Sequence, residues 1–429
     1  MRRTSIIIIV IVILLIASGF AYWYFFFHGP GNPTVSITSP TPQGNGFVPL
    51  NSGNSGRNSA TSTNTGSNNG QPVSNQPAPV KIATLRMLSG TPVGGYGSIT
   101  NATTTTVRWI DRGRGNVYEL ALNSETVNTL SNTILPRMFQ SVWNKNLTAL
   151  VGSIFTDNID TPTTVYAGLK AQATSTASSS NLVMTTPFAL KGNNLPDNVI
   201  AYAASPKGDK LFFMTDESGV GAGYISNFDG SGMTRLFNTP LLQVNVEWPE
   251  TNTIAITTKG SASQAGFLYF VNTKTGVWKK ILGPIAGLST RVSHDAKYVI
   301  ASSASKDQNV DTTIYSVSSS SPIGAVVRTL ADKCAWGNFY ADIVYCAVPS
   351  QPVSGAYPDD WYTGRLSTID KIWQVNAKTG EIHLVSSIVD QSDRVIDAFN
   401  LSIDPKDNYL FFMNKNDLTL WSYDLVASQ

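Results

Sequence analysis

Two short sequence phrases recur at intervals of roughly 40–50 residues, and this spacing constrains the fold more than any other feature. The first phrase is a polar turn followed by an apolar run, with its clearest copies at 204–213, 292–300 and 403–412. The second is an apolar strand ending in a turn closed by Gly, at 267–276 and 371–380. Both phrases encode short antiparallel strands joined by tight turns. A repeat of this length is typical of one four-stranded β-propeller blade.

The repeat copies predict an all-β fold: a single β-propeller over residues 81–429, with seven four-stranded blades. The copies are centred near Trp109, Trp143, Ser205, Trp248, Ser293, Trp336 and Asp404. Only three strands are evident in the last blade, which ends at 418–423. We expect segment 82–87 to add the fourth strand, because pairing the two ends of the chain closes the ring. Six or eight blades are the alternatives.

The turn phrases resemble the repeat of TolB-like β-propellers. In that family an S-P-D-G-like turn precedes one apolar strand, and a V-D-x-x-T-G-like turn follows the next. The nearest copy of the first motif in this sequence is S-P-K-G at 205–208, so the chain is a divergent example. The resemblance covers nearly all of 81–429 and implies the fold and a bacterial origin. It does not specify a partner.

The N-terminus predicts a membrane anchor. Residues 5–27 form an uncharged, strongly apolar run, and roughly 20 such residues cross a bilayer as a helix. The run closes with the aromatic segment 22–24, which suits the membrane–water interface. Arg2 and Arg3 precede it and the next cation is Arg57, so the positive-inside bias places the N-terminus in the cytoplasm.

This topology predicts a single-pass protein of the cytoplasmic membrane, with residues 1–4 inside the cell and everything after residue 27 exported. The alternative is a cleaved signal peptide, whose apolar region is usually only about 7–15 residues long. Residues 28–80 are rich in Pro, Ser, Asn and Gly, and 51–71 contain almost nothing apolar. Such a segment cannot bury enough surface to fold, so we predict a disordered linker. A glycosylated stalk is a second interpretation.

The two cysteines predict a disulfide. Cys334 and Cys346 flank a polar segment that is typical of a hairpin turn, and a turn centred near Tyr340 places them opposite each other on neighbouring strands. Exported domains meet oxidising conditions, in which such a pair forms a bond. Two separate buried thiols are the alternative.

The sequence contains no recognisable catalytic, metal-binding or cofactor motif, and we predict none of these. His28, His294 and His383 are scattered and lack the companion ligands of a zinc site. A nucleophile elbow, a P-loop and a dinucleotide fingerprint are all missing from the sequence. The formal net charge of +2 and the lack of a basic cluster argue against a nucleic-acid partner.

One segment departs from the repeat. The sixth blade contains an insertion from about 349 to 369 that is rich in aromatic and acidic residues. Insertions in propellers emerge as loops on one face, where binding sites are often built. The predicted binding residues of this loop are Tyr357, Asp359, Asp360, Trp361, Tyr362 and Arg365. We expect Trp361 and the two aspartates to be exposed; the alternative is that the aromatic residues fold back over the blade edge.

Three functions remain open at this point. The leading hypothesis is a non-enzymatic binding or scaffolding module that engages a protein or a cell-envelope polymer outside the cell. The second is a propeller-type polysaccharide lyase or hydrolase with its site in the central channel. The third is a structural subunit of an envelope or surface assembly. An enzyme requires titratable groups that converge on the channel, and an assembly subunit requires a large apolar patch.

Overall fold

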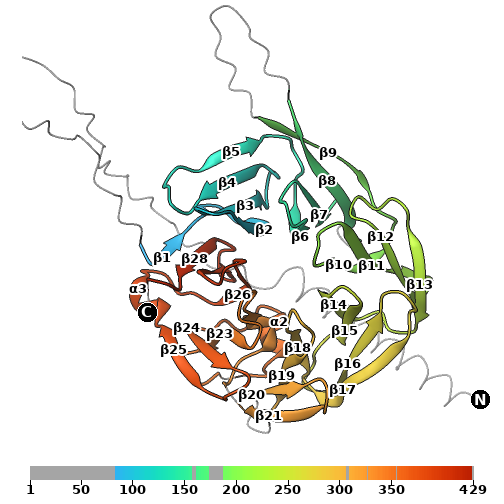
Figure 1. Cartoon of the computed structure of the whole chain (residues 1–429), viewed down its shortest axis with the longest axis vertical. Coiled ribbons are helices and arrows are strands. Elements are labelled where there is room, and N and C mark those ends of the chain that lie inside the picture. Colours follow the sequence, from blue (N-terminus) through green and yellow to red (C-terminus); the bar gives the residue numbers. More distant parts are fainter. Residues whose placement is uncertain are drawn as a thin grey trace, which may run out of the picture. The chain divides into compact units, whose positions relative to one another are not determined.

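The computed structural model describes residues 83–156, 161–172, 187–305, 309–325, 327–353 and 355–427. These residues form seven four-stranded antiparallel sheets around a central axis (Figure 1), which confirms the all-β seven-bladed propeller. The predicted membrane helix at 5–27 and the linker at 28–80 lie outside the described residues. No helix within the described ranges is long and apolar enough to cross a membrane.

The first four blades each contain four consecutive strands, which follow one another from the channel outward. Blade 1 comprises β2 (Val93–Thr100), β3 (Thr105–Asp111), β4 (Val117–Ala121) and β5 (Asn128–Ser131). Blade 2 comprises β6 (Met138–Trp143), β7 (Ala149–Ile154), β8 (Thr163–Ala171) and β9 (Phe188–Asn194). Blade 3 comprises β10 (Val199–Ala204), β11 (Lys210–Glu217), β12 (Val220–Asn227) and β13 (Thr234–Thr239). Blade 4 comprises β14 (Val244–Glu250), β15 (Thr253–Thr258), β16 (Ala265–Asn272) and β17 (Trp278–Ala286).

The last three blades carry the short helices. Blade 5 comprises β18 (Ser289–Val292), β19 (Tyr298–Ala304), β20 (Val310–Ser316) and β21 (Ser321–Ala325). Blade 6 comprises β22 (Cys334–Trp336), β23 (Ile343–Pro349), β24 (Asp370–Asn376) and β25 (Ile382–Ser386). Blade 7 comprises β26 (Ala398–Ile403), β27 (Tyr409–Asn414), β28 (Leu420–Asp424) and β1 (Leu85–Met87). The helical segments are η1 (Ala331–Lys333), α2 (Asp359–Tyr362) and α3 (Ile388–Gln391).

The recurring polar turn has one hydrogen-bond pattern in three blades. The side chain of its first residue, Ser205, Ser293 or Asp404, accepts a bond from the backbone N–H five residues later, at 3.0, 2.9 and 2.7 Å. The fourth turn position adopts a positive φ in each copy, +71° at Gly208. Gly suits this position because it has no Cβ to clash. The sequence phrase therefore encodes one specific turn between the two inner strands of a blade.

Strand β1 closes the ring as the sequence predicted. Leu85 pairs with Tyr423 and Met87 with Trp421 on β28, in an antiparallel register. The strand is shorter than the expected segment 82–87. This pairing gives blade 7 its fourth strand from the opposite end of the chain and joins the first blade to the last.

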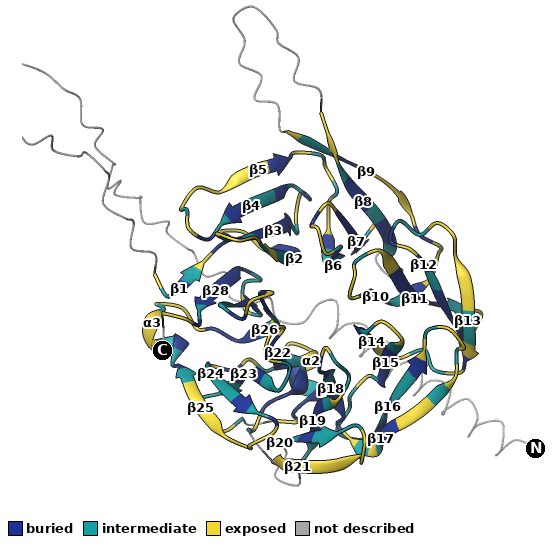
Figure 2. Cartoon of the chain, viewed as in Figure 1, coloured by how far each residue is buried: buried dark blue, intermediate teal, exposed yellow. Residues whose placement is uncertain are grey.

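The core lies between neighbouring blades. Phe212 and Met214 of blade 3, for example, pack against Val244 and Ile254 of blade 4. Figure 2 shows that buried residues are concentrated in the inner and middle strands, whereas outer strands such as β21 and β25 are mostly exposed. A sheet covered on both faces needs near-continuous apolar strands, which explains runs such as 211–214.

The predicted disulfide is present. Cys334 on β22 and Cys346 on β23 are register partners, with their Cα atoms 4.1 Å apart and their sulfur atoms bonded. The bond closes a loop that includes Phe339 and Tyr340, which are both exposed. It therefore covalently joins the two inner strands of blade 6.

Removing this bond is expected to destabilise the propeller. We predict that the double variant Cys334→Ala/Cys346→Ala lowers the free energy of unfolding by about 2–4 kcal/mol, because the unfolded chain is no longer restricted by the closed loop. Chemical denaturation of oxidised wild type, reduced wild type and the variant measures the effect. Equal midpoints for all three would contradict the prediction.

Candidate functional site: the mouth of the central channel

The insertion in blade 6 packs against the ring instead of projecting from it. It connects β23 to β24, and it contains helix α2. Trp361 is only 4% exposed and packs with Val310 and Leu330. Its indole Nε1 donates hydrogen bonds to both carboxylate oxygens of Asp397, at 3.1 and 3.0 Å. The expectation that Trp361 is exposed was therefore wrong. Its large apolar ring packs against apolar side chains inside the protein, and its one polar atom has a hydrogen-bond acceptor there.

The two aspartates of the insertion form hydrogen bonds and an ion pair that hold the insertion in place. Asp359 accepts a hydrogen bond from the backbone N–H of Ala262 in blade 4, at 2.8 Å. Asp360 accepts the backbone N–H of Ala356 at 2.9 Å and forms an ion pair with Arg365 at 2.6 Å. These bonds fix the loop and attach it to a distant blade. The predicted exposed surface of Trp361 with both aspartates is thus not assembled.

The remaining predicted residues of the loop are divided between the interior and the surface. Tyr357 is buried at 1% exposure, whereas Tyr362 is 39% exposed and the Arg365 side chain 70%. Tyr362 lines the central channel. Binding by the predicted loop residues stays a prediction; Tyr362 and an edge of the buried Trp361 line the same cavity.

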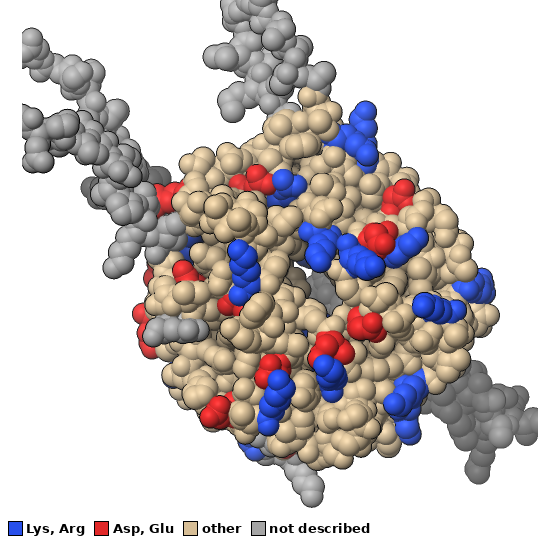
Figure 3. Space-filling view, in the orientation of Figure 1, with Lys and Arg blue, Asp and Glu red and all other residues tan. Residues whose placement is uncertain are grey.

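That cavity is the mouth of the channel, with a volume of about 630 Å³. It is lined by the inner strands β2, β6, β10, β14, β18 and β26, together with η1 and α2 of blade 6. All seven blades therefore contribute to one cavity. Figure 3 shows the opening at the centre of the ring, with both basic and acidic side chains around it.

Four side chains from three blades form a connected polar chain in this mouth. Glu247 of β14 lies 3.9 Å from Arg291 of β18, and Arg291 lies 4.0 Å from Asp332 of η1. Asp332 in turn accepts a hydrogen bond from the hydroxyl of Tyr362. Burial raises the pKa of Glu247, and Arg291 partly opposes that shift. The chain places one cation between two carboxyl groups, so Arg291 compensates one of the two negative charges.

Exposed amide side chains line the same cavity. Gln140 on β6, Asn245 on β14 and Asn400 on β26 come from three blades. Within the described part of the chain, the side-chain amides of Gln140 and Asn245 form no hydrogen bond to another residue. An amide offers both a donor and an acceptor, so these groups are available to a polar ligand. Aromatic rings of Phe139 and Phe399 lie in the same lining.

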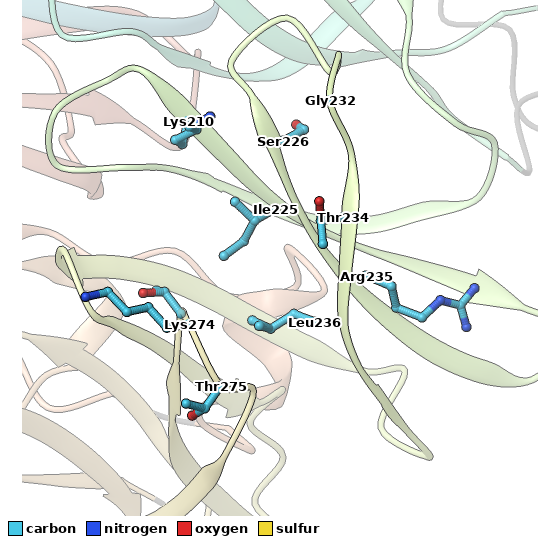
Figure 4. Close-up of a pocket in the computed structure, with 10 residues that line it drawn as sticks. Lys210, Ile225, Ser226, Gly232, Thr234, Arg235, Leu236, Lys274 and Thr275 are labelled. Atoms are coloured by element: carbon cyan, nitrogen blue, oxygen red, sulfur yellow. The ribbon is translucent and has the colours of Figure 1, made fainter.

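A second hollow lies on the outside of the ring between blades 3 and 4 (Figure 4), with a volume of about 420 Å³. Lys210, Lys274 and Arg235 are among its lining residues. The Arg235 side chain points away from the hollow, and its guanidinium pairs with Glu217 at 2.7 Å. This hollow draws on only two blades, so the channel mouth is the stronger candidate site.

Sequence reasoning did not identify the residues of the channel mouth. Glu247, Arg291, Asp332, Gln140 and Asn245 belong to no motif. The only feature that they share in the sequence is a position on or beside the first strand of a blade. That position does not predict a binding or catalytic role. Among the described residues, no group of three or more His, Cys, Asp or Glu side chains is placed to hold a metal ion.

No protein-family model matches the sequence, and no curated protein matches it. Similar solved structures include TolB from Acinetobacter baumannii, with 11% identity over 63% of this chain and 62% of TolB and a TM-score of 0.40. An oligogalacturonate lyase from Vibrio parahaemolyticus has 10% identity over 78% and 97% of the two chains, with a TM-score of 0.47. A puromycin-hydrolysing peptidase from Mycobacterium tuberculosis has 12% identity over 68% and 46%, with a TM-score of 0.43.

The chain thus spans less than two thirds of the TolB structure that it matches. At such identities the likeness concerns the fold alone. The function is therefore argued from the site.

Proposed function

We propose that this protein is a non-enzymatic binding module, tethered to the outer side of the cytoplasmic membrane, whose channel mouth holds a segment of a cell-envelope glycan. The observation that supports this most is the lining of the mouth. It combines free amides at Gln140 and Asn245 with aromatic rings at Phe139, Tyr362 and Phe399. Amides form paired hydrogen bonds with neighbouring sugar hydroxyls, and aromatic faces pack against the apolar face of a sugar ring.

Titratable side chains do converge on the channel mouth, as an enzyme would require, but they are engaged with one another. General acid–base chemistry needs a titratable group within reach of the substrate and near its required protonation state. In the channel mouth Arg291 lies between Glu247 and Asp332, and Tyr362 bonds to Asp332. Neither described histidine of the chain lines the cavity. The polar chain thus supports a rigid mouth in which these side chains already have partners within the protein.

The proposed location rests on the apolar run at 5–27 and the polar segment at 28–80. A flexible linker of that length lets the propeller reach a polymer at some distance from the membrane. In this proposal the N-terminal tether positions the propeller, and the channel mouth binds the glycan.

Binding is tested with the full-length chain in detergent micelles and purified envelope polysaccharides. We expect the double variant Gln140→Ala/Asn245→Ala to weaken binding about tenfold or more, because two ligand hydrogen bonds are lost. Its thermal stability should stay close to that of wild type, since both side chains are exposed. Asn128→Ala, an exposed amide on the outer strand β5, is the matched control and should bind normally.

Three results would contradict the proposal. Unchanged binding by the double variant would remove the channel mouth as the site. Shortening of the polysaccharide by the wild-type chain would favour the lyase or hydrolase hypothesis. Failure to bind any polysaccharide, together with co-purification in a defined protein assembly, would favour the structural-subunit hypothesis.

A further inference from the structure

Lys333 is a fully buried cation at the end of η1. Its side chain is 0% exposed. The Nζ atom contacts Asp370 Oδ2 at 2.8 Å and Asp370 Oδ1 at 3.0 Å, and it contacts Asp397 Oδ1 at 2.7 Å. Both carboxylates are also 0% exposed. The amine thus lies beside two carboxyl groups in a site shielded from solvent.

The charge balance of this cluster is unfavourable for a permanent ion pair. One ammonium faces two carboxylates, so an excess negative charge would be buried if all three groups ionised. Burial raises the pKa of Asp370, with Lys333 opposing the shift, and the nearby charge of Asp397 adds to it. Asp370 is therefore the carboxyl group that most readily takes up a proton. A protonated carboxyl is also the form that can lose water.

Asp397, in contrast to Asp370, is stabilised as an ionised carboxylate. Burial acts to raise its pKa, but Lys333 and hydrogen bonds from Trp361 and Thr368 outweigh burial and keep the pKa below its usual value. Asp397 Oδ2 accepts the indole N–H of Trp361 and the backbone N–H of Thr368, at 3.0 and 3.1 Å. It is a positioned carboxylate in direct contact with the amine, which is the arrangement of a general base.

Asp370 also has a backbone donor aimed at one oxygen. The N–H of Ala398 donates to Asp370 Oδ2 at 2.7 Å, and the hydroxyl of Thr368 donates to Oδ1 at 2.9 Å. A fixed N–H at this position stabilises negative charge that develops on the carboxyl oxygen when a nucleophile adds to its carbon. The Trp361 ring, with its centroid 5.5 Å from Lys333 Nζ, packs beside the amine.

We propose that Lys333 and Asp370 form an intramolecular isopeptide bond, with Asp397 acting as the proton carrier. The cluster supplies a nucleophile, an electrophile, a base and an oxyanion donor, all held together by the fold. Such preorganisation replaces a slow encounter between an amine and a carboxyl group with a reaction between neighbours. The product is a neutral amide, so the buried charge on Lys333 is eliminated.

The reaction balances without an added reagent. Asp397 takes one proton from the Lys333 ammonium, and the resulting amine attacks the carboxyl carbon of protonated Asp370. A nitrogen–carbon bond forms, and negative charge develops on the oxygen that accepts the Ala398 N–H. Asp397 then returns its proton to the hydroxyl of Asp370, the carbon–oxygen bond breaks and water leaves. Asp397 finally accepts the remaining extra proton from nitrogen, leaving a neutral amide and a protonated Asp397. It can hold this proton because the positive charge of Lys333, which lowered its pKa, is gone.

The bond would lie in the blade that carries the insertion. It would join η1 directly to the start of β24, next to the disulfide between β22 and β23. Blade 6 would then hold two covalent links, which suits a propeller displayed outside the cell. This inference does not depend on the proposed glycan binding, because it concerns a site buried beneath α2.

Peptide mass spectrometry of the full-length wild-type chain tests the proposal without any variant. After reduction of the disulfide, trypsin should leave the bond after Lys333 uncut, because the lysine is modified. We expect peptide 329–365 joined to peptide 366–371, at the sum of their masses less one water. Recovery of peptides 329–333 and 366–371 as separate, unmodified species would overturn the proposal. A water loss confined to one peptide, with conversion to a hydroxamate by hydroxylamine, would indicate a succinimide and would also overturn it.

Two variants test the assigned roles. Asp370→Ala should give the unlinked peptides, and a link from Lys333 to peptide 395–406 in wild type would show that Asp397 is the electrophile instead. Asp397→Asn keeps the size of the side chain but removes the base, so we expect a folded chain in which the link is lost or strongly reduced. Full linkage in folded Asp397→Asn would overturn the role given to Asp397.

Discussion

Replacing Lys333 by Met is expected to lower the free energy of unfolding by about 3–5 kcal/mol, because it leaves two buried carboxyl groups without their cation. The loss is expected in either state, because the substitution removes the cation from the unlinked cluster or removes the covalent link to Asp370, and both carboxyl groups are then buried without their lysine partner. Thermal and urea unfolding of the full-length chain measure it.

Lys378 provides a matched control on the surface of the same blade. It pairs with Asp342 at 3.2 Å, but its side chain is 63% exposed. Lys378→Met should change stability by no more than about 1 kcal/mol, because exposed ion pairs contribute little. Equal effects of the two substitutions would show that the buried cluster has no special role in stability.

Trp361→Ala is expected to destabilise the propeller by about 3–5 kcal/mol. The substitution empties the space between Val310 and Leu330 and removes the indole donor to Asp397. Trp361→Phe keeps most of the ring and loses only the N–H, so it should cost about 1–3 kcal/mol. The midpoint of thermal unfolding, measured with polysaccharide binding on the same samples, separates structure from recognition.

Tyr362→Ala is the control variant for the two Trp361 substitutions. Tyr362 follows Trp361 in α2 but is 39% exposed, so its loss should affect the channel lining more than stability. If Trp361→Ala melts like wild type and yet loses binding, Trp361 is a recognition residue and the structural interpretation of the loop is wrong.

Most of the architecture could be predicted from local patterns. The turn that begins at Ser205, Ser293 or Asp404 uses hydrogen bonds within five residues, so its sequence signature is compact and repeats. The pairing of Cys334 with Cys346 followed from the length of one hairpin. Ring closure by β1 followed from counting strands, since one blade was incomplete without it.

The candidate site could not be predicted in the same way. Gln140, Asn245 and Asn400 converge only because their blades are placed around one axis. The insertion illustrates the same limit. Its composition suggested an exposed surface, but the partners that bury it come from remote positions, with Asp397 receiving the Trp361 indole and Ala262 bonding to Asp359.

The sequence by itself determined the blade repeat, the turn chemistry, the strand that closes the ring and the partner of each cysteine. Each of these depends on neighbours close in the chain or on a simple count. Only the tertiary structure decided which side chains meet in the channel mouth and that Lys333 lies between Asp370 and Asp397. The physical reason is that burial and charge pairing depend on distances through space, and in a ring of blades residues far apart in sequence become neighbours.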